Sequence, residues 1–170
     1  SDDSSSGDRD EALATVLDQL LQGLLSMSGL ANESMVRDLG WQFMEAGRRI
    51  ERAIHVAMLV GTALTGERSA PVEGIVNESV LIAGESIITS RRRYRSRALT
   101  ANTIDLLFAD AGNPRSLRFQ IDRLQASVSQ LDADRGESVV SPAGERLAAL
   151  VERMDSTPAE SLLVVDDRGN

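Results

Sequence analysis

The sequence contains no cysteine and no lysine, and each absence removes a class of chemistry. Without cysteine, the chain has no disulfide, no thiolate metal site and no cysteine nucleophile. Without lysine, it cannot form the Schiff bases on which several covalent mechanisms depend. All 18 basic residues are therefore arginine. A GC-rich genome accounts for this bias, and the alternative is that arginine is kept for its bidentate fork.

Aromatic residues and long apolar runs are also scarce. Aromatics make up 3% of the 170 residues, so the core must be aliphatic, which suits helix-on-helix packing. No apolar run reaches the roughly 18 residues of a membrane span. The acidic start SDDSSSGDRDE is unlike a signal peptide, so we expect a cytoplasmic protein without membrane contact. The net charge of −8 argues against general nucleic-acid binding.

Apolar residues recur at steps of three and four along most of the chain, and no run alternates convincingly as a strand does. This periodicity predicts an all-α protein, an antiparallel bundle of five or six helices. We expect residues 1–9 to be disordered, residues 10–157 to form the bundle domain and residues 158–170 to be a weakly ordered tail. The predicted helices cover about residues 10–28, 33–65, 72–97, 103–108, 114–131 and 143–154.

Four further predictions concern local structure. Asn32 or Ser34 is expected to cap the helix over 33–65, and Asn113 the helix that begins at Pro114. A glycine inside a helix, as at Gly47, usually marks close packing against a neighbouring helix. The segment 162–165 (Leu-Leu-Val-Val) is compatible with either a short strand or a helical turn.

The segment EAGRRIER in the helix over 33–65 is dense in charge. Helical spacing places Trp41, Arg48, Glu51 and His55 on one face. One interpretation is ion pairing within the helix, Glu45 with Arg49 and Arg48 with Glu51. The other is a carboxylate and guanidinium set that lines an anion or carboxylate pocket. His55, the only histidine, is either a polar residue of the helix face or a general base.

The segment RRRYRSR at 91–97 holds five arginines in seven residues. Part of it suits the C-terminal end of a helix dipole, and Glu78 and Glu85 are candidate partners of the rest. A phosphate or nucleic-acid patch is the alternative, but Tyr94 is the only aromatic residue there. The glutamates lack the Glu-x-x-His spacing of di-iron bundles, and DAGNPRS lacks the lysine of a P-loop. We therefore predict no metal and no cofactor.

Three segments taken together point to a family: MVRDLGWQFMEAGRRIERA at 35–53, ESIITSRRRYRS at 85–96 and LLFADAGNPRSLRFQIDRL at 106–124. Their combination resembles the bacterial alpha-E domain, an all-helical family without a settled activity. The resemblance covers about residues 20–131. Because family members run to roughly twice this length (one domain of that size is unusual but allowed), it implies that this chain corresponds to their C-terminal half.

The resemblance also implies a functional setting. The family accompanies circularly permuted ATP-grasp ligases, as neighbouring genes or fused domains, and also transglutaminase-like proteases and proteasome-like hydrolases. That company implies a role in making, attaching or processing peptides. The family's motif residues carry over onto Trp41, Gly47, Arg48, Glu51, Arg52, Arg92, Tyr94, Arg95, Asn113, Pro114, Arg115 and Ser116.

The leading hypothesis is a non-catalytic helical accessory domain that binds an ATP-grasp ligase or its peptide substrate. It requires guanidinium and carboxylate groups of the helices over 33–65 and 72–97 to meet in space. Two alternatives remain. One is an enzyme in which a buried Glu51 and the arginine set perform acid–base chemistry on an amide or phosphate. The other is a structural domain in which the charges are interhelix struts. A homodimer is also an open alternative. The expected binding residues are Trp41, Arg48, Glu51, Arg52, Glu85, Arg92, Tyr94, Arg95, Asn113 and Arg115.

Overall fold

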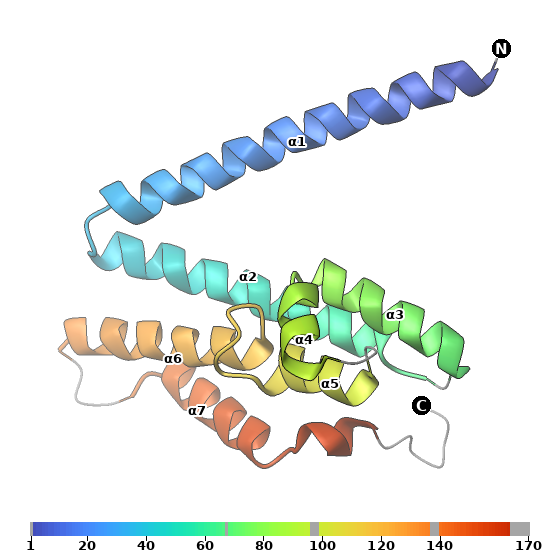
Figure 1. The fold of residues 1–170 in the computed structure, drawn as a ribbon. Helices are drawn as coiled ribbons and strands as arrows, with labels where there is room; N and C mark the ends of the chain where they lie inside the picture. Colours follow the sequence, from blue (N-terminus) through green and yellow to red (C-terminus); the bar gives the residue numbers. More distant parts are fainter. Residues whose placement is uncertain (1, 67, 96–98, 137–139, 164–170) are drawn as a thin grey trace. The chain divides into compact units, whose positions relative to one another are not determined.

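The computed structural model describes residues 2–66, 68–95, 99–136 and 140–163 (Figure 1). Within these ranges the regular structure is entirely helical, and no strand is present. The prediction of an all-α protein is therefore confirmed. The chain forms two compact units, Ser1–Trp41 and Gln42–Asn170.

The first unit consists mainly of one long helix, α1 (Asp2–Ser34). This helix includes residues 2–9, for which the composition predicted disorder, and it continues through Gly29, which was expected to end it. One glycine inside a helix costs only about 1 kcal/mol and does not by itself stop it. Its apolar side chains are exposed in the structure, at Leu13, Val16, Leu17, Leu20, Leu21, Leu24, Leu25, Met27 and Leu30.

The next helix, α2 (Leu39–Ala63), begins later than predicted. Neither Asn32 nor Ser34 caps it, because both belong to α1. The cap is Asp38, whose Oδ1 accepts a hydrogen bond from the backbone N–H of Trp41 at 3.1 Å. A carboxylate at this position satisfies one of the free N–H groups of the first turn.

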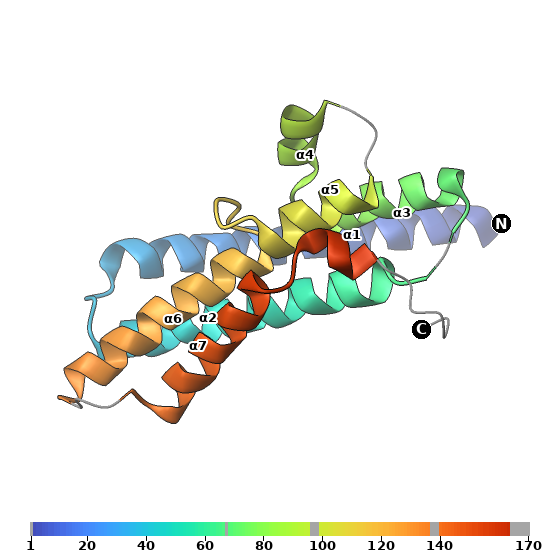
Figure 2. The same ribbon diagram turned by 90° about the horizontal axis from the view of Figure 1, so that it is seen from below.

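The second unit holds the rest of α2 and the helices that follow it (Figures 1 and 2). In this unit α6 packs along α7, and α3 packs against α5; a short π-helix continues α5 and contacts α6. The elements are α3 (Ala70–Ala83), α4 (Ile87–Tyr94), α5 (Thr100–Ile104), the π-helix (Asp105–Ala109), α6 (Leu117–Asp134), α7 (Pro142–Asp155) and a 3₁₀-helix (Ala159–Leu163).

The helix predicted over 72–97 is in fact two helices. The chain turns at Glu85, whose φ is 48°, in the left-handed region that non-glycine residues rarely occupy. Gly84 precedes it, and a Cβ at Gly84 would lie 3.0 Å from Leu107 Cδ2. The N–H of Ser86 donates to the carbonyl of Leu81 at 2.8 Å and closes the turn. The apolar pattern runs on through this corner, which is why periodicity alone predicted a single helix.

The remaining differences lie at helix ends. The cap of α6 is Ser116, whose Oγ accepts from the N–H of Phe119 at 3.0 Å, and not Asn113. Ser141 caps α7 in the same way, from the N–H of Gly144 at 3.2 Å. The segment 162–165 is helical as far as Leu163, and its last two residues lie outside the described ranges.

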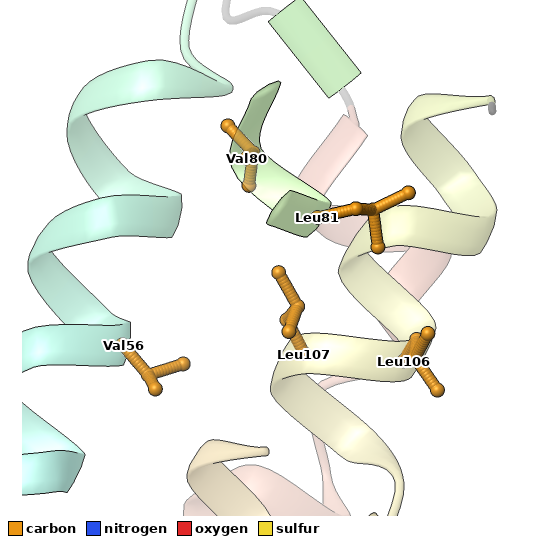
Figure 3. Close-up of a cluster of buried hydrophobic side chains, with 5 residues drawn as sticks. All are labelled: Val56, Val80, Leu81, Leu106 and Leu107. Atoms are coloured by element: carbon orange, nitrogen blue, oxygen red, sulfur yellow. The ribbon is translucent and has the colours of Figure 1, made fainter. Parts of the chain in front are cut away.

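Two apolar clusters hold α2 in the second unit. In the first, Val56 of α2 packs with Val80, Leu81, Leu106 and Leu107 (Figure 3). Figure 3 shows Leu107 of the π-helix pointing toward the space between α2 and α3. The second cluster joins α2 to α6 and α7 through Ala53, Ile121 and Met154. The residues of α2 between and beside these anchors are therefore fixed against α3, α6 and α7.

Candidate functional site

An open groove of about 450 Å³ lies in the second unit, beside the middle of α2. Four parts of the chain form it: α2, the corner between α3 and α4, Arg115 before α6, and Gln120 within α6. Its lining combines two arginines, two glutamates, the only histidine, a glutamine and a set of small and apolar residues. The lining residues are Glu51, Arg52, Ile54, His55, Val56, Met58, Ala83, Gly84, Glu85, Arg115 and Gln120.

Arg52 is the central cation of this groove. Its side chain is half-buried, and within the described ranges it makes neither an ion pair nor a hydrogen bond. Burial lowers the pKa of its guanidinium, and the neighbouring cations Arg115, Arg49 and Arg48 lower that pKa further, against a smaller opposite effect of Glu45. An arginine nevertheless remains charged at neutral pH. Arg52 is therefore a guanidinium in a positive environment with all its donors available.

The arginines next to Arg52 on α2 are paired. Arg49 Nε donates to Glu45 Oε1 at 2.7 Å, and Arg48 Nη1 lies 3.3 Å from Glu45 Oε2. Arg49 Nη1 also donates to Oε1 of the fully buried Gln120 at 3.1 Å. The predicted pair of Glu45 with Arg49 is confirmed, but Arg48 binds Glu45 and not Glu51. These bonds connect α2 to α6 and leave Arg52 outside the network.

The corner between α3 and α4 supplies the opposite wall. Glu85 forms an ion pair with Arg115 there. Side-chain exposure is 62% for Glu85 and 40% for Arg115, so solvent screens this pair and it adds little to stability. The pair nevertheless places one carboxylate and a second guanidinium at the rim of the groove. Glu85 had been expected to pair with an arginine of the 91–97 cluster, and it does not.

The loop that carries Arg115 is fixed by Asn113. This buried amide donates from Nδ2 to the carbonyl of Leu106 at 2.9 Å and to Ser86 Oγ at 3.2 Å, and its Oδ1 accepts from the N–H of Arg115 at 3.1 Å. One side chain thus joins the π-helix, the α3–α4 corner and the loop before α6. Asn113 positions the groove wall and does not line the groove.

The arginines of α4 do not reach the groove. Arg91 Nη2 donates to Glu78 at 2.5 Å, and Arg93 Nη1 donates to Asp110 at 2.6 Å. Arg92 and Arg95 are exposed and have no partner in the part of the chain that the structure describes. The predicted meeting of Arg48 and Glu51 with Arg92 and Arg95 is wrong.

Tyr94 and Trp41 also lie elsewhere. Tyr94 packs against the first apolar cluster, and its hydroxyl donates to Asp105 Oδ2 at 2.7 Å. Burial raises the pKa of this phenol, the hydrogen bond to Asp105 raises it further, and Arg93 partly offsets the rise. Trp41 belongs to the first unit, where the Arg37 guanidinium lies 3.5 Å from its ring centroid. Neither residue lines the groove.

Glu51 and His55 follow each other by one turn on α2 and are both exposed. Both line the groove together with Arg52. Glu51 makes no ion pair with any residue that the structure describes. A catalytic carboxylic acid usually works in a site from which water is excluded, and an exposed Glu51 does not fit that description.

Comparison with known proteins places this chain in a family. A family model described as a predicted alpha-helical domain with a conserved ER motif matches residues 3–168. The chain belongs to the Alpha-E family. The match includes the groove residues on α2, at the α3–α4 corner and on α6.

The similar curated proteins are themselves without an assigned function. Uncharacterized proteins of Mycobacterium bovis and of two Mycobacterium tuberculosis strains are each 38% identical to this Alpha-E chain over 134 residues. The alignment covers 79% of this chain and 15% of each relative, so the chain spans only a small part of their length. No solved structure matches the chain significantly.

The family's description draws attention to Glu-Arg dipeptides. In this Alpha-E chain they occur at 51–52, 67–68, 145–146 and 152–153. Among the described residues of these dipeptides, only Glu51 and Arg52 line the groove. Over the described residues, no cluster of histidine, aspartate and glutamate could hold a metal ion. No described helix is long and apolar enough to cross a membrane.

Of the residues predicted to bind, the structure therefore brings four together at the groove: Glu51, Arg52, Glu85 and Arg115. Sequence reasoning missed Gln120 and Gly84. Gln120 carried no signal, because one glutamine in an amphipathic helix is ordinary. Gly84 did carry one, since a glycine in the middle of an apolar repeat indicates a bend or a close approach.

Proposed function

We propose that this domain is a non-catalytic accessory module that binds an ATP-grasp ligase, or the peptide substrate of that ligase, through the groove beside α2, in the cytoplasm. The observation that carries the proposal is Arg52. This residue is a half-buried cation among cations, and none of the described residues pairs with it. A charge kept in such a place is poorly explained by stability alone.

The lining supports a binding role. Arg52 and Arg115 offer forked donors that suit carboxylates. Val56 and Ala83 lie on the groove wall, and the exposed Ile54 and Met58 extend an apolar surface at its edge. Charged donors beside apolar side chains are typical of surfaces that recognise another protein or a peptide.

The two other interpretations explain fewer of the observations. An enzyme based on Glu51 would need that carboxyl in a dry site, and it is exposed. A purely structural role accounts for the contacts of Arg49, which bridges Glu45 and Gln120. A structural role does not account for Arg52, which bonds to no residue in the described ranges. We therefore favour binding over both.

The ligase enters the proposal through the family resemblance of the three motif segments and not through the geometry. The curated relatives are several times longer than the aligned segment. A module that forms a small part of a long protein is well suited to hold a substrate or a partner for a catalytic domain elsewhere.

The test is a binding measurement with the ATP-grasp ligase of the same organism. Wild-type protein, Arg52→Gln and Arg92→Gln would be titrated with the ligase by calorimetry. Arg92→Gln is the matched control, because Arg92 is an exposed arginine of α4 without a described partner and outside the groove. We expect Arg52→Gln alone to weaken binding, by about ten-fold or more. Equal affinities for all three folded proteins would reject the groove as the binding surface.

A further inference from the structure

We propose that the Arg52 end of the groove is a binding site for one carboxylate, namely the C-terminal carboxylate of a peptide that ends in an aliphatic residue, and not for a phosphate. This inference rests on the proposed function and names the ligand chemistry of the same groove. It depends on the available donors, on the local charge balance and on the apolar wall.

The available donors of Arg52 suit an anion. A guanidinium has five N–H donors in a planar fork, and Arg52 gives none of them to a described residue. Of the carboxylates around it, only Glu51 has no described partner, and Glu51 forms no ion pair with Arg52 although both line the groove. Glu45 is already paired with Arg48 and Arg49, and Glu85 is already paired with Arg115. Gln120 uses Oε1 for Arg49 and donates from Nε2 to the carbonyl of Pro114 at 2.5 Å. No described residue accepts from Arg52, so its fork is available to solvent and to an anion that enters the groove.

The charge balance selects a monoanion. Four arginines surround this end of the groove, at positions 48, 49, 52 and 115. Three glutamates accompany them: Glu45 on α2, and Glu51 and Glu85 in the lining. One positive charge is left in excess. A phosphoryl group carries about −1.5 to −2 at pH 7, and it would meet the exposed carboxylates of Glu51 and Glu85. A carboxylate carries a single charge, so it balances the excess and meets a smaller repulsion from the same two glutamates.

The apolar wall indicates the end of a peptide chain. Val56 is buried on α2, one turn after Arg52, and Ala83 at the end of α3 lines the same groove. A terminal residue presents a carboxylate and a side chain on adjacent atoms, so it can contact the fork of Arg52 and this wall together. Val56, Ala83 and Gly84 are small lining residues, which suits an aliphatic side chain such as that of leucine. The groove is open, so the rest of the peptide can leave it.

The experiment compares two probes that differ in one group. Acetyl-Ala-Ala-Leu with a free C-terminus and the same peptide as its C-terminal amide would be titrated into the whole chain, with the arginine Nε–H signals followed by NMR. Inorganic phosphate is the third probe. Wild type, Arg52→Gln, Arg52→Lys and Arg92→Gln would be measured. Because Arg52 bonds to no described residue, its variants should fold, and circular dichroism would verify this.

We expect the free-carboxylate peptide to shift the Arg52 signal and to bind at least about ten-fold more tightly than the amide. Arg52→Gln should abolish this difference, and Arg52→Lys should lose most of it because the charge remains without the fork. Arg92→Gln should behave as wild type. Phosphate should bind more weakly than the peptide.

Any of four results would overturn the inference: no binding of the free-carboxylate peptide at millimolar concentration, equal affinity for acid and amide, tighter binding of phosphate, or an equal loss in Arg92→Gln. The ligase titration separates this inference from the proposed function. If ligase binding depends on Arg52 while acid and amide bind alike, only the carboxylate assignment fails. If the acid binds through Arg52 and the ligase does not, the ligase proposal fails.

Discussion

Asn113 and Arg52 are two polar residues near the groove that differ in their hydrogen bonding. This difference distinguishes a structural residue from a candidate binding residue. Asn113 is buried, and its amide makes three hydrogen bonds, to Leu106, Ser86 and Arg115. Arg52 is half-buried and makes none with the described residues. Both positions belong to motif segments, so sequence reasoning treated them alike. Only the contacts show that Asn113 holds the groove wall in place and that Arg52 is free to bind.

Asn113→Ala should lower the free energy of unfolding by about 2 kcal/mol, because it leaves the buried carbonyl of Leu106 without its donor. Asn102→Ala is a matched control: Asn102 is a partly exposed asparagine of α5, and its replacement should change stability by no more than about 0.5 kcal/mol. Chemical denaturation measures both. Equal effects of the two substitutions would show that Asn113 is not the clamp described here.

Tyr94, the only tyrosine, gives a prediction about pH. Its folded-state pKa is raised above 10.0, first by burial and then by its hydrogen bond to Asp105. The unfolded chain therefore loses this proton first, so the stability that Tyr94 contributes is complete below pH 10.0 and falls as the pH rises through the folded-state pKa. Phenolate absorbance should show a higher pKa in the native protein than in denaturant, and Asp105→Asn should reduce that difference. Coinciding titrations would contradict the assignment.

At the scale of single elements, apolar spacing predicted which segments are helical but not where they bend. The steps from Val76 through Val80 and Ala83 to Ile87 fit one continuous helix, yet the chain turns at Glu85. The spacing of apolar residues shows which positions are buried, and α3 and α4 pack against the same apolar cluster. The spacing does not show the backbone conformation at Glu85, where the helix is interrupted. For the same reason the spacing could not show which of the arginines at 91–95 would approach α2, since their direction is set by that turn.

Two glycines should respond in opposite ways to alanine. A Cβ at Gly47 in α2 would meet no atom within 4 Å, so the predicted close packing there is wrong, and Gly47→Ala should raise the free energy of unfolding by about 1 kcal/mol. A Cβ at Gly84 would lie 3.0 Å from the fully buried Leu107 and 3.2 Å from the carbonyl of Val80. Gly84→Ala should therefore cost about 1–3 kcal/mol. Thermal and chemical unfolding measure both, and a loss of stability in Gly47→Ala would mean that another surface covers α2 at this point.

At the scale of the whole molecule, the groove depends on residues that are far apart in sequence. Arg52, Glu85 and Arg115 lie on different elements, and the π-helix with its neighbours brings these elements together. The family resemblance identified the three motif segments, but it did not show which side chains of these segments would line the groove. That choice is made by packing in the second unit, where Val56 and Leu107 share a cluster and Asn113 links the corner to the loop. Pairwise contacts of this kind cannot be read from one sequence.

The two units should differ in how a leucine contributes to stability. Leu107 of the π-helix is fully buried, and Leu24 of α1 is 63% exposed. Leu107→Ala should cost about 2–5 kcal/mol through lost burial and a residual cavity, whereas Leu24→Ala should change the free energy of unfolding by less than about 0.5 kcal/mol. Chemical denaturation at two protein concentrations measures both and also detects association. If Leu24→Ala is costly only at the higher concentration, a second copy covers the leucines of α1, as an apolar face of this length would allow. If it is costly at both, α1 contributes to a core within the chain, and its exposure is not that of the protein in solution.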